Sequence, residues 1–359
     1  MMTRYLIRCG LTLGGFLVAA VCWAQPSATG TTPATATPTA LITPPEHRRG
    51  VEQTFLTYPE WYLVFSPAEY AAFVQHGTPD QFPFLGHIGQ FWSGYLTVFE
   101  KSRSMGHDLN PGYHLMVMVI GISTTVEYAL RAAYENSFGA LSQATASAPT
   151  AEDRLASRVA QEYVDFIRVF PWYEFDFWRQ FKSLWTELPM VGPDMLRKWE
   201  RRFALSLEYG IKAGYAQLIK LGTQAVYDPA LLVTSVQLKP LPPSDPQWPD
   251  VHVLAQSPDG TALVTVPRYD AFMRYAQSLA SRGADFSEIA GNRSVILVSL
   301  VGDTGWRPQQ GVEAVLFEQP ILTQPGRQRV VVTAKVPTLA QALREWTSAG
   351  VQVEHIFDY

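Results

Sequence analysis

The hydrophobic pattern of the chain is dominated by one long stretch, residues 112–142, whose spacing predicts a helix. Its first part, residues 115–126, carries no charge, and apolar and charged residues then alternate at helical spacing. Residues 112–130 come close to the ~20 residues that a helix needs to cross a bilayer. Glu127 falls among them, and a charge inside a bilayer is unfavourable. This charge favours a buried core helix of a soluble domain, with a membrane-entering helix as the alternative.

Further helical patterns flank this stretch on both sides. Thr150, with Glu152 and Asp153 in the first turn, is a typical helix start. Pro171 ends the helix that follows. Residues 46–227 are therefore predicted to form a mostly helical domain, with helical patterns at 67–75, 82–102, 151–170 and 194–222.

The last third of the chain changes to short apolar runs bounded by turn residues. Residues 228–249 are rich in proline and are predicted to be a linker, with a short strand allowed at 231–238. Residues 250–359 show the order β-α-β-β-α-β, which predicts a ferredoxin-like domain. The expected fold class is α+β, with the helical domain first, and no internal repeat is evident.

The N-terminal residues predict an address outside the cytoplasm. Residues 1–24 combine Arg4 and Arg8 with a short apolar run and a small-residue cleavage site, as in a secretory signal. An uncleaved N-terminal anchor is the alternative. Residues 25–45 form a Pro/Thr/Ala tract that is predicted to be a disordered linker. We therefore expect an exported protein that is periplasmic, or attached to the membrane and facing the periplasm.

The two cysteines of the chain, Cys9 and Cys22, both lie in this export segment. A chain cleaved before Gln25 would contain none. That excludes a disulfide framework, a thiolate zinc site, an iron–sulfur cluster and a cysteine nucleophile from the mature protein.

Composition narrows the classes of partner. The net charge of −4 argues against a nucleic-acid partner, which requires a basic surface. Charged residues make up 17% of the chain and aromatic residues 13%, which points to an aromatic core or to contact with a membrane interface. The densest aromatic stretch, residues 172–185, gives the candidates for ligand or membrane contact: Trp172, Tyr173, Phe177, Trp178 and Trp185.

Candidate chemistry is confined to a few acidic residues and one histidine. Glu127, Glu162 and Asp165 are the candidate metal ligands, because carboxylates on facing helices can hold metal ions, although the usual Glu-x-x-His spacing is missing. Glu127, Glu135 and His87 are the candidate catalytic residues. The simpler interpretations are a helical salt-bridge ladder for the carboxylates and a hydrogen-bonded structural role for the histidine. Motifs for dinucleotides, nucleoside triphosphates, zinc peptidases and serine hydrolases do not occur.

These features favour an exported, membrane-associated cell-envelope protein that binds or scaffolds through its aromatic-rich helical domain rather than catalysing a reaction. Its expected partners are membrane lipid or an apolar ligand, together with a protein at the C-terminal domain. The alternatives are a metal- or cofactor-dependent enzyme with a carboxylate site in the helical domain, and a soluble periplasmic carrier of an apolar small molecule. The sequence identifies no cofactor.

Overall fold

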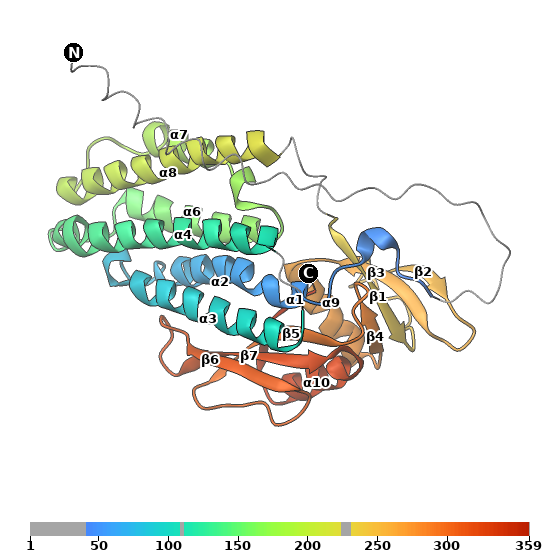
Figure 1. Cartoon of the computed structure of the whole chain (residues 1–359). Helices are drawn as coiled ribbons and strands as arrows, with labels where there is room; N and C mark the ends of the chain where they lie inside the picture. Colours follow the sequence, from blue (N-terminus) through green and yellow to red (C-terminus); the bar gives the residue numbers. More distant parts are fainter. Residues whose placement is uncertain (1–40, 108–110, 224–230, 359) are drawn as a thin grey trace, which may run out of the picture.

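A computed structural model describes residues 41–107, 111–223 and 231–358, and in it an N-terminal group of helices precedes the strands (Figure 1). The expected export signal and most of the expected linker lie outside these residues. The N-terminal helices are α1 (Gln53–Leu56), α2 (Tyr58–Phe73), α3 (Phe84–Ser104), α4 (Pro111–Tyr134), α5 (Ala140–Gln143), α6 (Ala151–Ile167), α7 (Phe177–Thr186) and α8 (Met195–Thr223). A π-helical turn, η3 (Glu135–Gly139), joins α4 to α5, and short 3-10 turns lie at η1 (Pro45–His47), η2 (Pro79–Gln81) and η4 (Trp172–Glu174).

The second part of the chain forms two antiparallel four-stranded sheets. Sheet A has the order β2-β3-β1-β4, and sheet B has the order β6-β7-β5-β8. The elements are β1 (Val233–Lys239), β2 (His252–Gln256), β3 (Ala262–Pro267), α9 (Asp270–Ser281), β4 (Asp285–Ile289), β5 (Val295–Asp303), β6 (Ala314–Pro320), β7 (Arg327–Lys335), α10 (Val336–Ser348) and β8 (Gln352–Ile356). The α+β class is thus confirmed at the level of mixed helices and sheets.

The ferredoxin-like topology is not confirmed. The strands of residues 250–359 separate into two sheets instead of forming one, and sheet A takes a central strand, β1, from the expected linker. The strand allowed at 231–238 is therefore present, but it belongs to the sheet. Hydrophobic alternation located most of the strands, but it does not encode which of them pair.

The two sheets are copies of one topology. Each is built in the order strand, strand, strand, helix, strand, and the first strand of each unit pairs with the third and the fourth. The registers also correspond, since Val236 lies opposite Val264 in sheet A and Val298 lies opposite Val332 in sheet B. The chain therefore contains a structural duplication that the sequence did not reveal.

Local irregularities recur at equivalent points of the two units. The pairing of the first and fourth strands is interrupted after Gln237 in sheet A and after Ser299 in sheet B. Each unit's helix is followed by a glycine with positive φ, Gly283 at 88° and Gly350 at 71°, a conformation that other residues rarely adopt. The units share turn chemistry and burial pattern more than residue identity, which explains why the repeat was missed.

Sheet B is covered on both faces. One face joins α9, α10 and sheet A in the largest hydrophobic core. The other face packs against α1, α2 and α3 through Leu297, Val331 and Phe357, and these helices lie over the sheet in Figure 1. The buried Thr54 hydroxyl donates to the Phe357 carbonyl and accepts from the Leu297 amide, each at 2.9 Å. The helical part and the sheets thus share one packed boundary.

Sheet A has a polar outer face that residues 41–50 cover. The Gln237 side chain donates to the Leu41 carbonyl at 3.1 Å, and the Thr43 hydroxyl donates to the Glu288 carboxylate. The Arg49 amide donates to the carbonyl of Ala290, the residue that follows β4. Residues 41–45 were expected to belong to the disordered linker, but these hydrogen bonds place them on sheet A.

Candidate functional site

The most unusual feature of the fold is the polarity of α8, whose charged side chains point inward. Arg197, Lys198, Arg201 and Arg202 are at most 3% exposed. A buried charge requires a partner, because its desolvation otherwise outweighs what burial contributes. The ion pairs to other parts of the chain are Arg197 with Asp153 (2.8 Å), Lys198 with Glu152 (2.7 Å), Arg201 with Glu135 (2.9 Å) and Arg202 with Glu152 (2.6 Å).

The start of α6 supplies two of these carboxylates. Thr150 caps the helix by accepting from the Asp153 amide, and the Asp153 carboxylate accepts from the Thr150 amide in return. This reciprocal cap, which the sequence predicted, fixes the first turn of α6. Glu152 and Asp153 are thereby held against the buried cations of α8.

A second set of ion pairs links α4 to α8. Lys212 lies 2.9 Å from Glu127 and 2.9 Å from Glu208, and Arg131 lies 3.6 Å from Glu208. Earlier residues of α4 pair with later residues of α8, so the two helices are antiparallel. Of the expected ladder on α4, Glu127 and Arg131 are neighbours at 3.7 Å. Glu135 instead pairs across to α8.

The outward sides of α4 and α8 are apolar. No charged side chain of either helix is fully exposed, and each is buried or half-buried. Helical rotation from the ion-paired positions places the exposed apolar residues of both helices on the same side of the pair. We call the following set the apolar face: Leu115, Ile122, Val126, Leu130, Leu196, Phe203, Leu207, Ile211, Leu218 and Leu221.

The interpretation of residues 112–142 as a buried core helix is therefore wrong. Within α4, Val117, Gly121, Tyr128 and Ala132 are the buried residues. Within the described residues, the continuous helix Pro111–Gln143 is the one helix long and apolar enough to cross a membrane, and most of its apolar window is not buried. Because Glu127 is neutralised by Lys212, its charge does not force the helix into the core.

The aromatic stretch divides between the core and the surface. Phe177 is buried in the core of α6, α7 and α8, and Trp172 and Tyr173 are half-buried. Trp178 and Trp185 are exposed. Trp185 packs against Trp199 of α8 with ring centroids 6.3 Å apart. Two of the five candidates for membrane contact thus reach the surface, and one of these adjoins α8.

The second notable cluster surrounds His87, which is 1% exposed on α3. Its Nδ1 lies 3.3 Å from the Tyr62 hydroxyl, and its Nε2 lies 3.6 Å from Oε2 of Glu69 on α2. The ring stacks on Phe82 with centroids 4.6 Å apart. Burial lowers the pKa of His87 to about 3, and the nearby charge of Arg329 acts in the same direction.

Arg329 on β7 connects this cluster to sheet B. Its guanidinium donates to Oε1 of Glu69 at 2.9 Å and to both carboxylate oxygens of Glu354 at 2.6 and 2.7 Å. Glu354 lies at the irregularity of β8, where the register passes from Val353 to His355. The sequence singled out His87 alone, because Glu69 lies on a different helix and Arg329 and Glu354 are far away along the chain.

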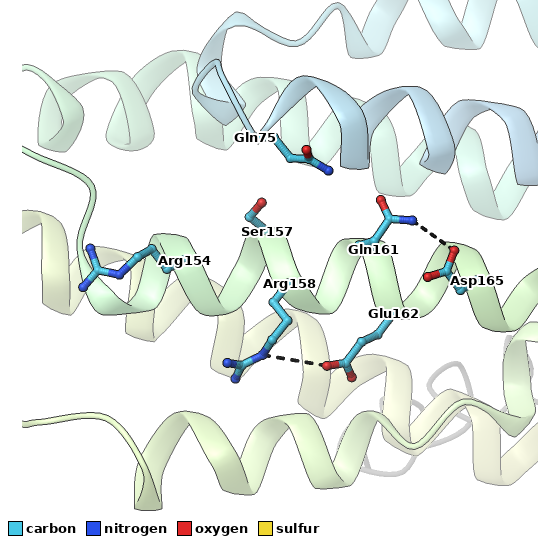
Figure 2. A pocket seen from close by; sticks show the side chains of 7 residues that line it. All are labelled: Gln75, Arg154, Ser157, Arg158, Gln161, Glu162 and Asp165. Atoms are coloured by element: carbon cyan, nitrogen blue, oxygen red, sulfur yellow. Dashed lines mark hydrogen bonds and ion pairs between the residues drawn. The ribbon is translucent and has the colours of Figure 1, made fainter.

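The remaining candidates do not assemble into a metal centre. Glu162 and Asp165 line a shallow hollow on α6 beside Gln75, and they bond with Arg158 and Gln161 of the same helix (Figure 2). Glu127 is on α4 and pairs with cations. Nowhere in ranges 41–107, 111–223 and 231–358 do three His, Cys, Asp or Glu side chains gather as metal ligands. Each of these carboxylates instead has a cationic or amide partner.

Comparison of the chain with models of known protein families, with curated proteins and with solved structures found no match.

Proposed function

We propose that this chain is a non-enzymatic, membrane-associated protein of the cell envelope that binds lipid through the apolar face of α4 and α8. The inverted polarity of α8 is the observation that carries the proposal. A surface helix of a soluble protein turns its apolar side inward. Here Arg202 is fully buried while Leu207 and Ile211 are 54% and 62% exposed.

The size of the face suits a bilayer. The two helices have 24 and 29 residues, and large exposed apolar areas mark interaction sites on soluble proteins. Each large apolar side chain that moves from water into the membrane contributes about 1–2 kcal/mol to the free energy of binding. Amphipathic helices that lie in the plane of a membrane use the same division between apolar and polar sides.

Aromatic residues at the edge of the face support lipid as the partner. Trp199, near the start of α8, packs beside Trp185 of α7, and both rings are partly exposed. Tryptophan accumulates at membrane interfaces because its ring is apolar and its N–H is polar. The Trp185 N–H donates to Ser206 at 2.9 Å, which leaves the ring itself available for contact.

A soluble carrier is less well supported than a membrane-bound protein. The hollow shown in Figure 2 is lined by polar and charged side chains, among them Arg154, Arg158 and Glu162. Such a lining does not match an apolar cargo, because binding would leave these groups without water. The apolar surface of the chain lies on the outside of α4 and α8 instead.

We infer that the rest of the molecule serves as the soluble part of the envelope protein. The expected export signal would deliver the chain to the periplasm, where the apolar face can reach the membrane. In the sheets, β2 is an edge strand with exposed Val253 and Leu254. An exposed edge can take up a strand from a protein partner, which makes β2 the surface for the expected protein partner.

The apolar face could be covered by lipid or by a second copy of the chain. Vesicle flotation of the mature chain distinguishes these two possibilities. Gly214 lies on the apolar face of α8, between Ile211 and Leu218, and a side chain added there would meet no atom of the chain. We expect Gly214→Leu to float with vesicles at least as well as the wild type, since it enlarges the apolar area.

Measuring the oligomeric state of the protein without lipid shows whether a second copy covers the apolar face instead. A wild-type dimer that Gly214→Leu dissociates would assign the face to a second copy, because the added side chain would block close approach of another helix. The control is Thr338→Glu on α10, an exposed position away from the face, which should change neither flotation nor size.

A further inference from the structure

A buried carboxyl and a buried imidazole face each other where the helices meet sheet B. Glu69 on α2 and His87 on α3 are 7% and 1% exposed, and Arg329 beneath them is 1% exposed. Three polar atoms in this group have no hydrogen-bond partner: Oε2 of Glu69, Nε2 of His87 and Nη1 of Arg329. Buried polar atoms are nearly always paired, so the unpaired atoms indicate how protons are arranged here.

The hydrogen bonds around Tyr62 determine which nitrogen of His87 carries the proton. The Gln90 amide nitrogen donates to the Pro320 carbonyl at 2.7 Å, which leaves the Gln90 oxygen facing the Tyr62 hydroxyl at 3.1 Å. Tyr62 must donate its one proton to that oxygen. Its own oxygen then accepts from Nδ1–H of His87. Nε2 of His87 consequently presents a lone pair to Oε2 of Glu69.

The charges of the cluster balance only if one more proton is present. The single positive charge of Arg329 is shared between Glu69 and Glu354. With His87 neutral, two ionised carboxylates would leave an uncompensated negative charge in the interior, which is strongly unfavourable. They would also set a carboxylate lone pair against the lone pair of Nε2, 3.6 Å away.

We propose that Glu69 is protonated at neutral pH and that its Oε2–H donates to Nε2 of His87, making this pair a buried proton-binding site. The 3.6 Å separation is too long for a hydrogen bond as it stands. The proposal requires a small rotation of the Glu69 carboxyl that brings Oε2 within hydrogen-bond distance of Nε2. Burial raises the pKa of Glu69, although Arg329 opposes the shift, and burial lowers the pKa of His87.

The other groups around the pair leave this assignment intact. The Tyr128 hydroxyl of α4 bonds with Ser66 at 2.8 Å, so it does not serve the pair. Beyond burial, Arg329 lowers the pKa of Glu69, Glu354 raises it, and a hydrogen bond from Thr323, after β6, lowers it. Tyr58 lies beside Tyr62 on α2, and burial raises the pKa of both phenols, so neither ionises near neutral pH.

The site makes the stability of the fold depend on pH in a defined direction. Above about pH 6.5 an unfolded chain holds no proton on either side chain, while the folded chain holds one on Glu69. The unfolding constant should therefore rise about tenfold per pH unit above pH 6.5, until folded Glu69 ionises. Between about pH 4.5 and 6.5 each state holds one proton and the pair adds no slope. Below that, stability is lost because unfolded chains bind a second proton.

The variant Glu69→Gln imitates the protonated carboxyl. Its amide oxygen can accept from Arg329, and its NH₂ group can donate to His87. We expect the variant to fold and to lose the tenfold rise per pH unit that the wild type shows above pH 6.5. Burial raises the pKa of Asp358 to about 7, so the band is compared between proteins: the infrared difference spectrum, full-length mature wild type minus variant at pH 7, should show a protonated carboxyl. The control Glu162→Gln removes an exposed carboxylate of α6, so it should keep both that band and the rise per pH unit.

Nitrogen-15 NMR of the His87 ring provides a test that needs no variant to fold, and the ring should carry a proton on Nδ1 alone. A doubly protonated ring at pH 7 would overturn the proposal. So would a difference spectrum without a protonated-carboxyl band, or a Glu69→Gln variant that keeps the tenfold rise per pH unit above pH 6.5.

Discussion

Replacing Leu207 and Ile211 together by glutamate is expected to weaken binding of the mature chain to vesicles at least a hundredfold. Both side chains are more than half exposed on the apolar face, so the substitution should leave the fold intact. Removing two such side chains from the lipid contact forfeits about 3 kcal/mol, which corresponds to a factor above one hundred. Two new charges at the interface would weaken binding further.

Sedimentation of the variant with vesicles measures this effect, and circular dichroism checks the fold. The matched control again uses Thr338→Glu, which introduces the same charge on the exposed side of α10. If the double variant and the control bound vesicles as tightly as the wild type, the apolar face would not be the lipid-binding surface.

Removing the Glu152 carboxylate should destabilise the fold by about 3–5 kcal/mol, the usual effect of breaking a buried ion pair from one side. Glu152 is fully buried and accepts from Lys198 at 2.7 Å and from Arg202 at 2.6 Å. Glu152→Ala would leave two buried cations without their carboxylate. Urea unfolding followed by tryptophan fluorescence gives the loss of stability.

The same helix offers a matched control for this prediction. Glu162 on α6 pairs with Arg158 and Arg179, but all three side chains are substantially exposed. Exposed pairs contribute at most about 1 kcal/mol, so Glu162→Ala should shift unfolding only slightly. Equal losses for the two variants would contradict the account of α8 as a helix held by buried charges.

Local signals in the sequence predicted most of the helices, but the start expected at Pro67 is wrong, because Pro67 lies inside α2 (Tyr58–Phe73). The capping residues at Thr150 and the breaks at proline located α6 and its end, and alternation located most strands. The pairing of β1 with β3 and β4 depends on contacts across long stretches of chain, which no local pattern encodes. The duplicated topology was hidden for a related reason. Equivalent positions share their burial, as in Val236 and Val298, while most other residues differ.

The candidate site failed to appear in the sequence for a different physical reason. The spacing of Leu207, Ile211 and Leu218 shows an amphipathic helix, but periodicity does not say which side faces inward. The usual assumption puts the apolar side in the core. In α8 the charged side faces inward instead, because α6 and η3 bring carboxylates against Arg201 and Arg202. These carboxylates lie about 50 to 70 residues away from the two arginines along the chain.

Accessibility of a single spin label on the apolar face is the most direct measurement of the central claim. A mature chain cleaved before Gln25 contains no cysteine, so Ile211→Cys provides one unique attachment point, with Thr338→Cys as the control. The account predicts that vesicles make the label at 211 accessible to oxygen and shield it from a water-soluble nickel complex, while the label at 338 stays exposed to nickel. A label at 211 that stays as accessible to nickel with vesicles as without them would contradict it.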